Sequence, residues 1–182
     1  PFEKAISSKN KYLKLIRDFN FNIVPSTISF RTDLDRLQID TKLRNLVGDK
    51  FEIPTIYNRD FLWGRHYGLK YDFSKALSLD FTSSNTSRVE EPWGPPTQAT
   101  KDSLWASLKR GGRTMEYNQT ATIKYNVPIE KLPFLDWTKL RTTYGTTYRW
   151  LSGPIVLADS LNNGATVSNS QNIQINGELN FT

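Results

Sequence analysis

Long stretches of the sequence alternate between apolar and polar residues with a period of two. Every odd position from Tyr67 to Phe73 is apolar, and the residues between them are polar or small. The same alternation resumes from Leu77 to Phe81. Because successive side chains of a β-strand point to opposite sides, this period predicts strands with one apolar and one polar face. The pattern therefore constrains the chain to an all-β fold whose two faces differ in chemistry.

These two stretches are predicted to form a hairpin with a three-residue turn at 74–76. In an antiparallel hairpin, the numbers of two opposite residues have a constant sum. The apolar positions are odd in both strands, so they share a face only if that sum is even. Pairing Phe73 with Leu77 meets this condition, whereas a two-residue turn would put the two apolar rows on opposite faces.

The alternation recurs along the chain and predicts about six long strands. They are expected at roughly 27–43, 60–73, 77–88, 114–129, 138–151 and 169–181. The connections alternate in length, with short turns at 74–76 and 130–137. The long loops, at 44–59, 89–113 and 152–168, are rich in Pro, Gly, Asn and Asp. This organisation predicts one antiparallel region over 19–182.

Two stretches are expected to depart from the strand pattern. Residues 100–110, with Leu104, Trp105 and Leu108, could form a short helix inside the second long loop. Residues 1–18 do not alternate cleanly and are interpreted as a connecting segment that could be helical. The chain opens at Pro1 and still alternates at its last residues, which predicts a segment of something longer.

The composition argues against several classes of active site. The 182 residues include no Cys and a single His, His66, so no Cys-based site and no His-rich metal centre is expected. No run of about 20 apolar residues is present to form a transmembrane helix. The net charge is +6, but the one tight basic cluster, Lys109, Arg110 and Arg113, lacks the repeated copies typical of RGG-type nucleic-acid binding. The sequence therefore predicts no catalytic residue, cofactor, metal or nucleic-acid partner.

The length of the strands favours a membrane barrel over a soluble sandwich. Several predicted strands have 13 residues or more, whereas strands of globular proteins most often have about 5–6. Strands of outer-membrane barrels are long, carry aromatic residues near their ends and are joined alternately by short turns and long loops. The predicted fold is therefore a segment of an antiparallel transmembrane β-barrel. Known barrels start at about eight strands, so these six are expected to pair with other strands.

The alternation assigns the two faces residue by residue. The apolar set is predicted to face lipid, and its members are Tyr67, Leu69, Tyr71, Phe73, Leu77, Leu79, Phe81, Ile123, Tyr125, Tyr144, Tyr148 and Trp150. The polar set is predicted to face the lumen, and its members are Lys70, Asp72, Ser78, Asp80, Lys124, Lys139, Arg141 and Arg149.

Several long segments carry a family resemblance. They read RDFNFNIVP at 17–25, STISFRTDLDR at 26–36, FLWGRHYGLKYDFSKALSLDFTSSNTSRVEEPWGP at 61–95, YNQTATIKYNVPIEKLPFLDW at 117–137 and TTYGTTYRW at 142–150. In content and order they resemble the SprA (Sov) family of giant outer-membrane proteins of Bacteroidota. The resemblance covers nearly everything from about Lys14 onwards.

The resemblance implies a function and a location. The family forms the translocon of the type IX secretion system, which also supports gliding motility, as one very large barrel in the outer membrane of these Gram-negative bacteria. It has no enzymatic activity. The implied partners are the remaining strands of the parent barrel, outer-membrane lipid, secreted cargo proteins, a PorV-type barrel, a periplasmic plug protein and a prolyl isomerase.

Two other interpretations remain open. The chain could be a soluble surface β-sandwich that binds glycans through exposed aromatic residues such as Trp93 and Trp105. It could also belong to a porin-type or receptor-type barrel for small solutes, which shares the barrel fold and differs only in the family motifs. Dependence on detergent would separate the sandwich from both barrels.

Overall fold

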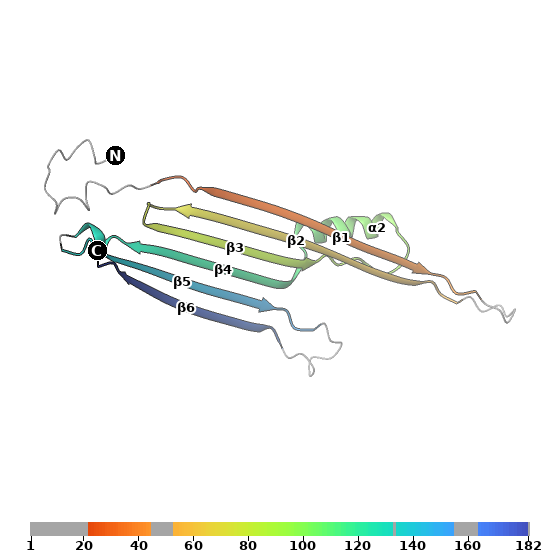
Figure 1. Ribbon diagram of the computed structural model, residues 1–182. Helices are drawn as coiled ribbons and strands as arrows, with labels where there is room; N and C mark the ends of the chain where they lie inside the picture. Colours follow the sequence, from red (N-terminus) through yellow and green to blue (C-terminus); the bar gives the residue numbers. More distant parts are fainter. Residues whose placement is uncertain (1–21, 45–52, 133, 155–163, 182) are drawn as a thin grey trace.

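The computed structural model describes residues 22–44, 53–132, 134–154 and 164–181. They form one antiparallel sheet in which each strand pairs with its neighbours in the sequence (Figure 1). The strands are β1 (Thr27–Thr41), β2 (Ile56–Asp72), β3 (Leu77–Arg88), β4 (Arg113–Val127), β5 (Thr138–Leu151) and β6 (Thr166–Leu179). The prediction of an antiparallel β-sheet with about six long strands is therefore confirmed, in a structure that is mostly β.

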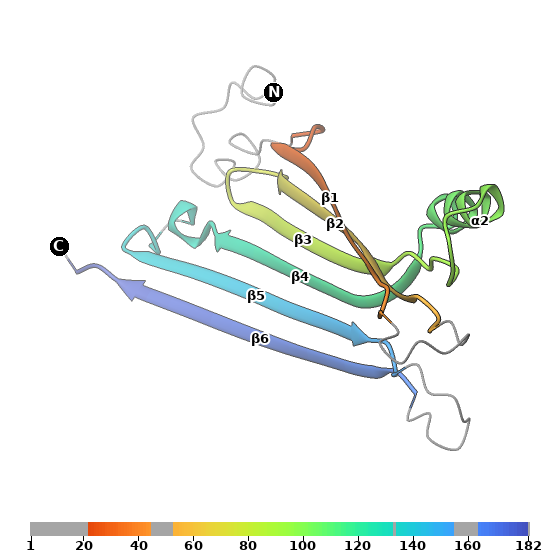
Figure 2. The ribbon, with the colours of Figure 1, turned by 90° about the vertical axis from the view of Figure 1, so that its right-hand side faces the viewer.

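The sheet is a single open layer. Its strand order runs from β1 to β6, so within the described ranges these two strands are its edges and the sheet does not close into a barrel. Figure 2 shows the layer twisted and curved, with α2 (Gln98–Lys109) beyond the end of β3 and β4. Among the described residues, no helix is both long and apolar enough to cross a membrane.

The register of the predicted hairpin is confirmed. Asp72 lies opposite Ser78, which places Phe73 opposite Leu77 across a turn at 74–76. The turn is closed by a hydrogen bond from the Ser74 N–H to the Leu77 carbonyl at 3.2 Å. The Ser74 hydroxyl accepts from two further N–H groups of the turn. The side chain of Ser74 therefore stabilises the three-residue turn that the parity of the apolar positions requires.

Some strand ends differ from the prediction for identifiable reasons. β2 begins at Ile56, earlier than expected, because Arg59 and Asp60 interrupt the alternation without ending the strand. β4 ends at Val127, since Pro128 has no N–H to donate and begins the short helix η3 (Ile129–Lys131) instead. β6 begins three residues before its predicted start.

The expected helix in the second long loop is present as α2. It begins at a capping box, in which the Thr97 hydroxyl accepts from the Thr100 N–H and the Thr100 hydroxyl accepts from the Thr97 N–H. The segment 1–18, which was expected to connect and to be potentially helical, lies outside the described residues.

The sheet has almost no apolar core. Among the described residues only Phe61 and Val89 are buried hydrophobic side chains. They lie opposite each other where β3 runs into the loop, and the Val89 N–H donates to the Phe61 carbonyl at 2.8 Å. The remaining apolar side chains are covered on one side only, by their neighbours in the sheet.

Candidate functional surfaces

One face of the sheet collects most of the apolar residues of the six strands, while Leu37, Ile39 and Leu62 lie on the other face. The ladder places Tyr71 opposite Leu79 and Leu79 opposite Ile123, which in turn lies opposite Tyr144. The whole set predicted to face lipid falls on this face, which we call the apolar face. The edge strands extend it with Ile28, Phe30, Leu34, Val167, Ile173 and Ile175. The register thus places these residues on one face. That this face contacts lipid stays a prediction.

The apolar face is largely uncovered. Ile28 exposes 74% of its surface, and Ile173 and Ile175 expose 65% each. A soluble β-sandwich would cover such side chains with a second sheet, but the described residues supply only one layer. The apolar face therefore needs a cover that these residues do not provide.

Aromatic side chains gather toward both ends of this face. Toward the loop end, Tyr117 contacts Tyr148 edge-on at 6.1 Å, and nearer the middle of the face Tyr67 contacts Phe30 with ring centres 5.2 Å apart. At the turn end, Tyr71 contacts Phe73 with ring centres 4.1 Å apart. This distribution resembles the aromatic girdles of membrane barrels.

The strand β5 is long enough to cross a bilayer. The first and last of its 14 residues lie thirteen steps apart, which corresponds to about 44 Å of antiparallel strand. For a strand tilted by about 45° this length spans about 30 Å along the membrane normal, the thickness of a bilayer's hydrocarbon core.

The opposite face collects the polar residues. The whole set predicted to face the lumen lies on it, as the pairs Lys70–Asp80, Ser78–Lys124 and Lys139–Glu178 illustrate. We call this surface the polar face. The register accounts for the grouping, and its exposure to a lumen stays a prediction.

Ion pairs between neighbouring strands balance much of the charge on the polar face. Lys124 Nζ lies 2.9 Å from an Asp80 oxygen, and Arg149 Nη2 lies 2.9 Å from Glu116 Oε1. All four side chains are at least one-third exposed, so each pair contributes little to stability, about 0–1 kcal/mol. The polar face therefore presents mixed charges and hydroxyls without a dominant sign.

The sequence features weighed for catalysis or metal binding do not converge. His66 Nε2 lies 3.2 Å from an Asp33 oxygen on the half-exposed polar face. In the described ranges no three His, Cys, Asp or Glu side chains come together as a metal site. His66 is thus part of a polar ladder in this structure.

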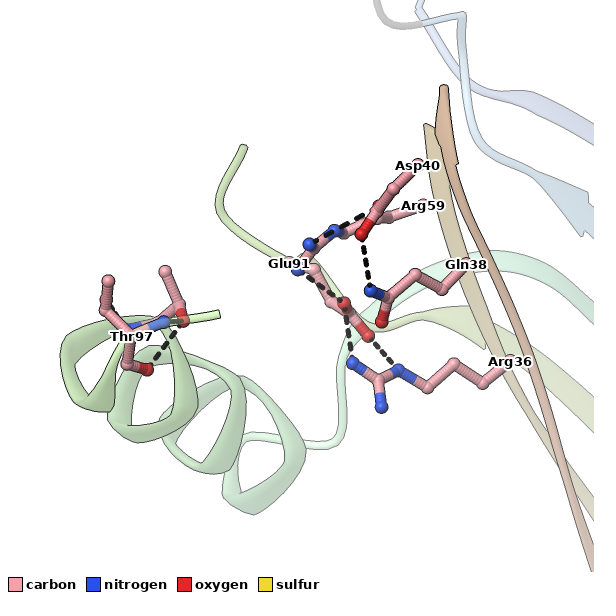
Figure 3. A network of polar contacts seen from close by, with 7 residues as sticks. Arg36, Gln38, Asp40, Arg59, Glu91 and Thr97 are labelled. Carbon is pink, nitrogen blue, oxygen red and sulfur yellow. Dashed lines mark hydrogen bonds and ion pairs between the residues drawn. The ribbon is translucent and has the colours of Figure 1, made fainter. Parts of the chain in front are cut away.

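An ion-pair cluster at the loop end of the apolar face was not anticipated (Figure 3). The Glu91 carboxylate accepts from Arg36 Nε at 2.5 Å and from Arg36 Nη2 at 3.0 Å. Arg59 Nη1 lies 3.8 Å from the same carboxylate, and Arg59 Nη2 lies 3.8 Å from Asp40. The Glu91 side chain is only 4% exposed and that of Arg59 only 8%. This arrangement holds the loop that follows β3 against β1 and β2.

A second contact holds the other end of the same loop. Arg65 Nη2 donates to the Ser87 hydroxyl at 2.7 Å and to the Gly111 carbonyl at 3.1 Å. The Arg65 guanidinium also lies 4.8 Å from the centre of the Trp63 ring. Residues 89–112, here named the covering segment, are therefore fastened to the apolar face at both ends.

Glycine is required where the covering segment returns to the sheet. Gly111 and Gly112 have φ values of 85° and 69°, which other residues rarely adopt. A Cβ on Gly112 would also lie 2.8 Å from the Arg88 carbonyl oxygen. One sequence signal could have revealed where the covering segment attaches. Arg36, Arg59 and Arg65 occupy strand positions whose side chains belong to the apolar face.

Comparison with known proteins adds no assignment. No protein-family model matches the sequence, and no curated protein matches it.

Proposed function

We propose that this chain forms part of the wall of an outer-membrane β-barrel, the protein-conducting translocon of a type IX secretion system. One observation carries the proposal. A single layer of long strands has an exposed apolar face on one side and, on the other, a polar face whose charges form ion pairs. The resemblance to the SprA family supplies the identity of the barrel.

Lipid accounts for the uncovered apolar face. Soluble monomers rarely expose contiguous apolar patches larger than a few hundred Å², whereas the apolar face here extends over six strands. Acyl chains can cover such a surface without a second protein layer. Inside a bilayer, however, unpaired backbone groups are costly, so β1 and β6 pair with further strands of the parent barrel.

The polar face suits a conduit. Its charges are balanced by neighbours such as the Asp80–Lys124 pair, so no single cargo sequence is held tightly. Transport requires binding weak enough to permit release. The chain thus acts as a passive wall for secreted cargo and is not an enzyme. A PorV-type barrel, a plug protein and a prolyl isomerase are the partners that the resemblance implies.

Two alternatives make different demands. A porin-type or receptor-type barrel would use the same two faces, and only the resemblance disfavours it. A glycan-binding sandwich would require a second sheet over the apolar face, although Trp93 is 85% exposed and available for stacking on a sugar.

Depletion of the full-length protein in the bacterium that encodes it separates the three functions. A translocon predicts that folded cargo accumulates in the periplasm while uptake of small solutes continues. Loss of solute uptake without cargo accumulation would identify a porin or receptor. Release of the protein from membranes by an alkaline carbonate wash would identify a surface sandwich.

A further inference from the structure

We propose that the covering segment is an interfacial anchor that binds the phosphate groups of outer-leaflet lipid headgroups. This inference rests on the proposed function, because it requires the apolar face to meet lipid. It assigns a ligand class to Lys101, Lys109 and Arg110 of the covering segment.

The covering segment docks on the apolar face at a defined level. Its contacts to Arg36, Arg59 and Arg65 all lie toward the loop end of that face. A charged side chain on the lipid face is costly inside the hydrocarbon core of the bilayer. We therefore place these arginines outside that core. Tyr117 lies level with Arg65 across the sheet, and Tyr67 comes next along β2 toward the turn end. The covering segment therefore lies at the height where lipid headgroups meet the barrel.

The helix α2 has two unlike sides. Leu104, Ser107 and Leu108 are partly buried and follow the spacing of one helical face. The Ser107 hydroxyl accepts from the Glu90 N–H at 3.2 Å, which ties this side to the start of the covering segment. The residues on the remaining surface of the helix are exposed and available to a ligand.

The exposed surface combines cations with an aromatic ring. Lys101, Trp105 and Lys109 are spaced four residues apart and form one stripe. Trp105 is 63% exposed, and Arg110 adds a further cation at the end of the helix. Asp102 is the only acidic residue of α2. Tryptophan with lysine or arginine is the combination that anchors proteins at membrane–water interfaces.

Phosphate is the ligand that matches this surface. The cations complement an anionic headgroup layer, and clusters of Lys and Arg near a membrane surface are attracted to anionic lipid. A protein partner fits less well. Stable protein interfaces bury about 800 Å² per partner, whereas this stripe is only one side of a helix of 12 residues.

The test uses the full-length protein in nanodiscs. The 182 residues contain no Cys, so an environment-sensitive thiol dye can report from Ala106→Cys on the exposed side of α2. The nanodiscs contain either phosphatidylcholine alone, whose phosphate is balanced by its own choline cation, or phosphatidylcholine with lipid A, whose phosphate groups carry an unbalanced negative charge. We expect the dye emission to shift to shorter wavelength only when lipid A is present.

Charge variants test which residues bind. Combining Lys101→Gln, Lys109→Gln and Arg110→Gln should abolish most of the shift. The matched control, with Lys75→Gln, Lys131→Gln and Lys139→Gln near the opposite end of the sheet, should retain it. An equal shift in phosphatidylcholine alone, an equal loss in the control, no shift at all, or a shift that requires another protein would each overturn the proposal.

Two reference positions keep the two proposals distinguishable. A dye at Leu79→Cys on the apolar face should be quenched by brominated acyl chains, and a dye at Thr82→Cys on the polar face should not. If the Leu79→Cys dye is quenched and the emission of the Ala106→Cys dye does not change with lipid A, the proposed phosphate site is wrong and the barrel proposal stands. If the Leu79→Cys and Thr82→Cys dyes behave alike, the barrel proposal itself fails.

Discussion

The Arg36 guanidinium donates two hydrogen bonds, at 2.5 and 3.0 Å, to the carboxylate of Glu91, a residue 55 positions away in the chain. A bidentate pair of this kind fixes orientation as well as distance. Arg59 lies on the other side of the same carboxylate, so two cations from adjacent strands hold one loop residue. The covering segment is therefore attached to the apolar face by charge, although the face itself is largely hydrophobic.

Removing Glu91 should release the covering segment. Glu91→Ala leaves the nearly buried Arg59 with Asp40 as its remaining carboxylate, and loss of one partner from a buried pair costs about 3–5 kcal/mol. Hydrogen exchange in 89–112 of the full-length protein should accelerate. The matched control is Glu90→Ala, which removes the adjacent and exposed carboxylate. Unchanged exchange in Glu91→Ala would show that the cluster does not hold the segment.

The orientation of the faces can be tested within β3. Leu79→Arg should impair assembly of the barrel, because a charged side chain at the middle of the lipid face costs about 2–4 kcal/mol. Thr82→Arg is the matched change on the polar face and should be tolerated. Heat-modifiable mobility in gels measures assembly, and equal tolerance of both variants would contradict the assignment of the apolar face to lipid.

The two ends of the sheet should lie on opposite sides of the outer membrane. Bacterial barrels usually have short turns in the periplasm and long loops outside. Lys75→Cys lies in the short turn and Pro96→Cys in the covering segment, and these 182 residues contain no native Cys that would react. An impermeant thiol reagent on intact cells should label position 96 and spare position 75. The reverse pattern would invert the topology.

A passive wall should tolerate the loss of one charge on its polar face. Lys70→Gln removes a cation that lies opposite Asp80 in the ladder. We expect secretion of several unrelated cargo proteins to change little, because the surrounding charges are mixed. Secretion into the medium can be measured for each cargo in parallel. Selective loss of one cargo, with assembly intact, would mean that this surface recognises cargo.

The backbone turn that leads from the covering segment back into β4 should depend on Gly112. Gly112→Ala adds a Cβ to a residue at φ 69°, close to the Arg88 carbonyl. Such a change should destabilise by more than about 1 kcal/mol. Gly145→Ala is the control, since its Cβ would meet nothing within 4 Å. The temperature at which the barrel loses its compact gel mobility should fall only for Gly112→Ala.

The strands and the register of the hairpin could be predicted from the local pattern of residues. Alternation is a local property, so Tyr67 to Phe73 and Leu77 to Phe81 were enough to predict two strands, their turn and their shared face. Strand ends were harder to predict, because a charged residue such as Arg59 can lie within a strand whose other side chains alternate.

The position of the covering segment and the contacts that hold it depend on the folded arrangement of the strands. Glu91 meets Arg36 and Arg59 across long separations in the chain, and no local pattern encodes such contacts. Arg65 in β2 likewise contacts Gly111 from far along the chain, so its role could not be predicted from the local pattern. Periodicity reports which side of a strand a residue occupies, whereas a contact between distant residues exists only once the strands have been brought together.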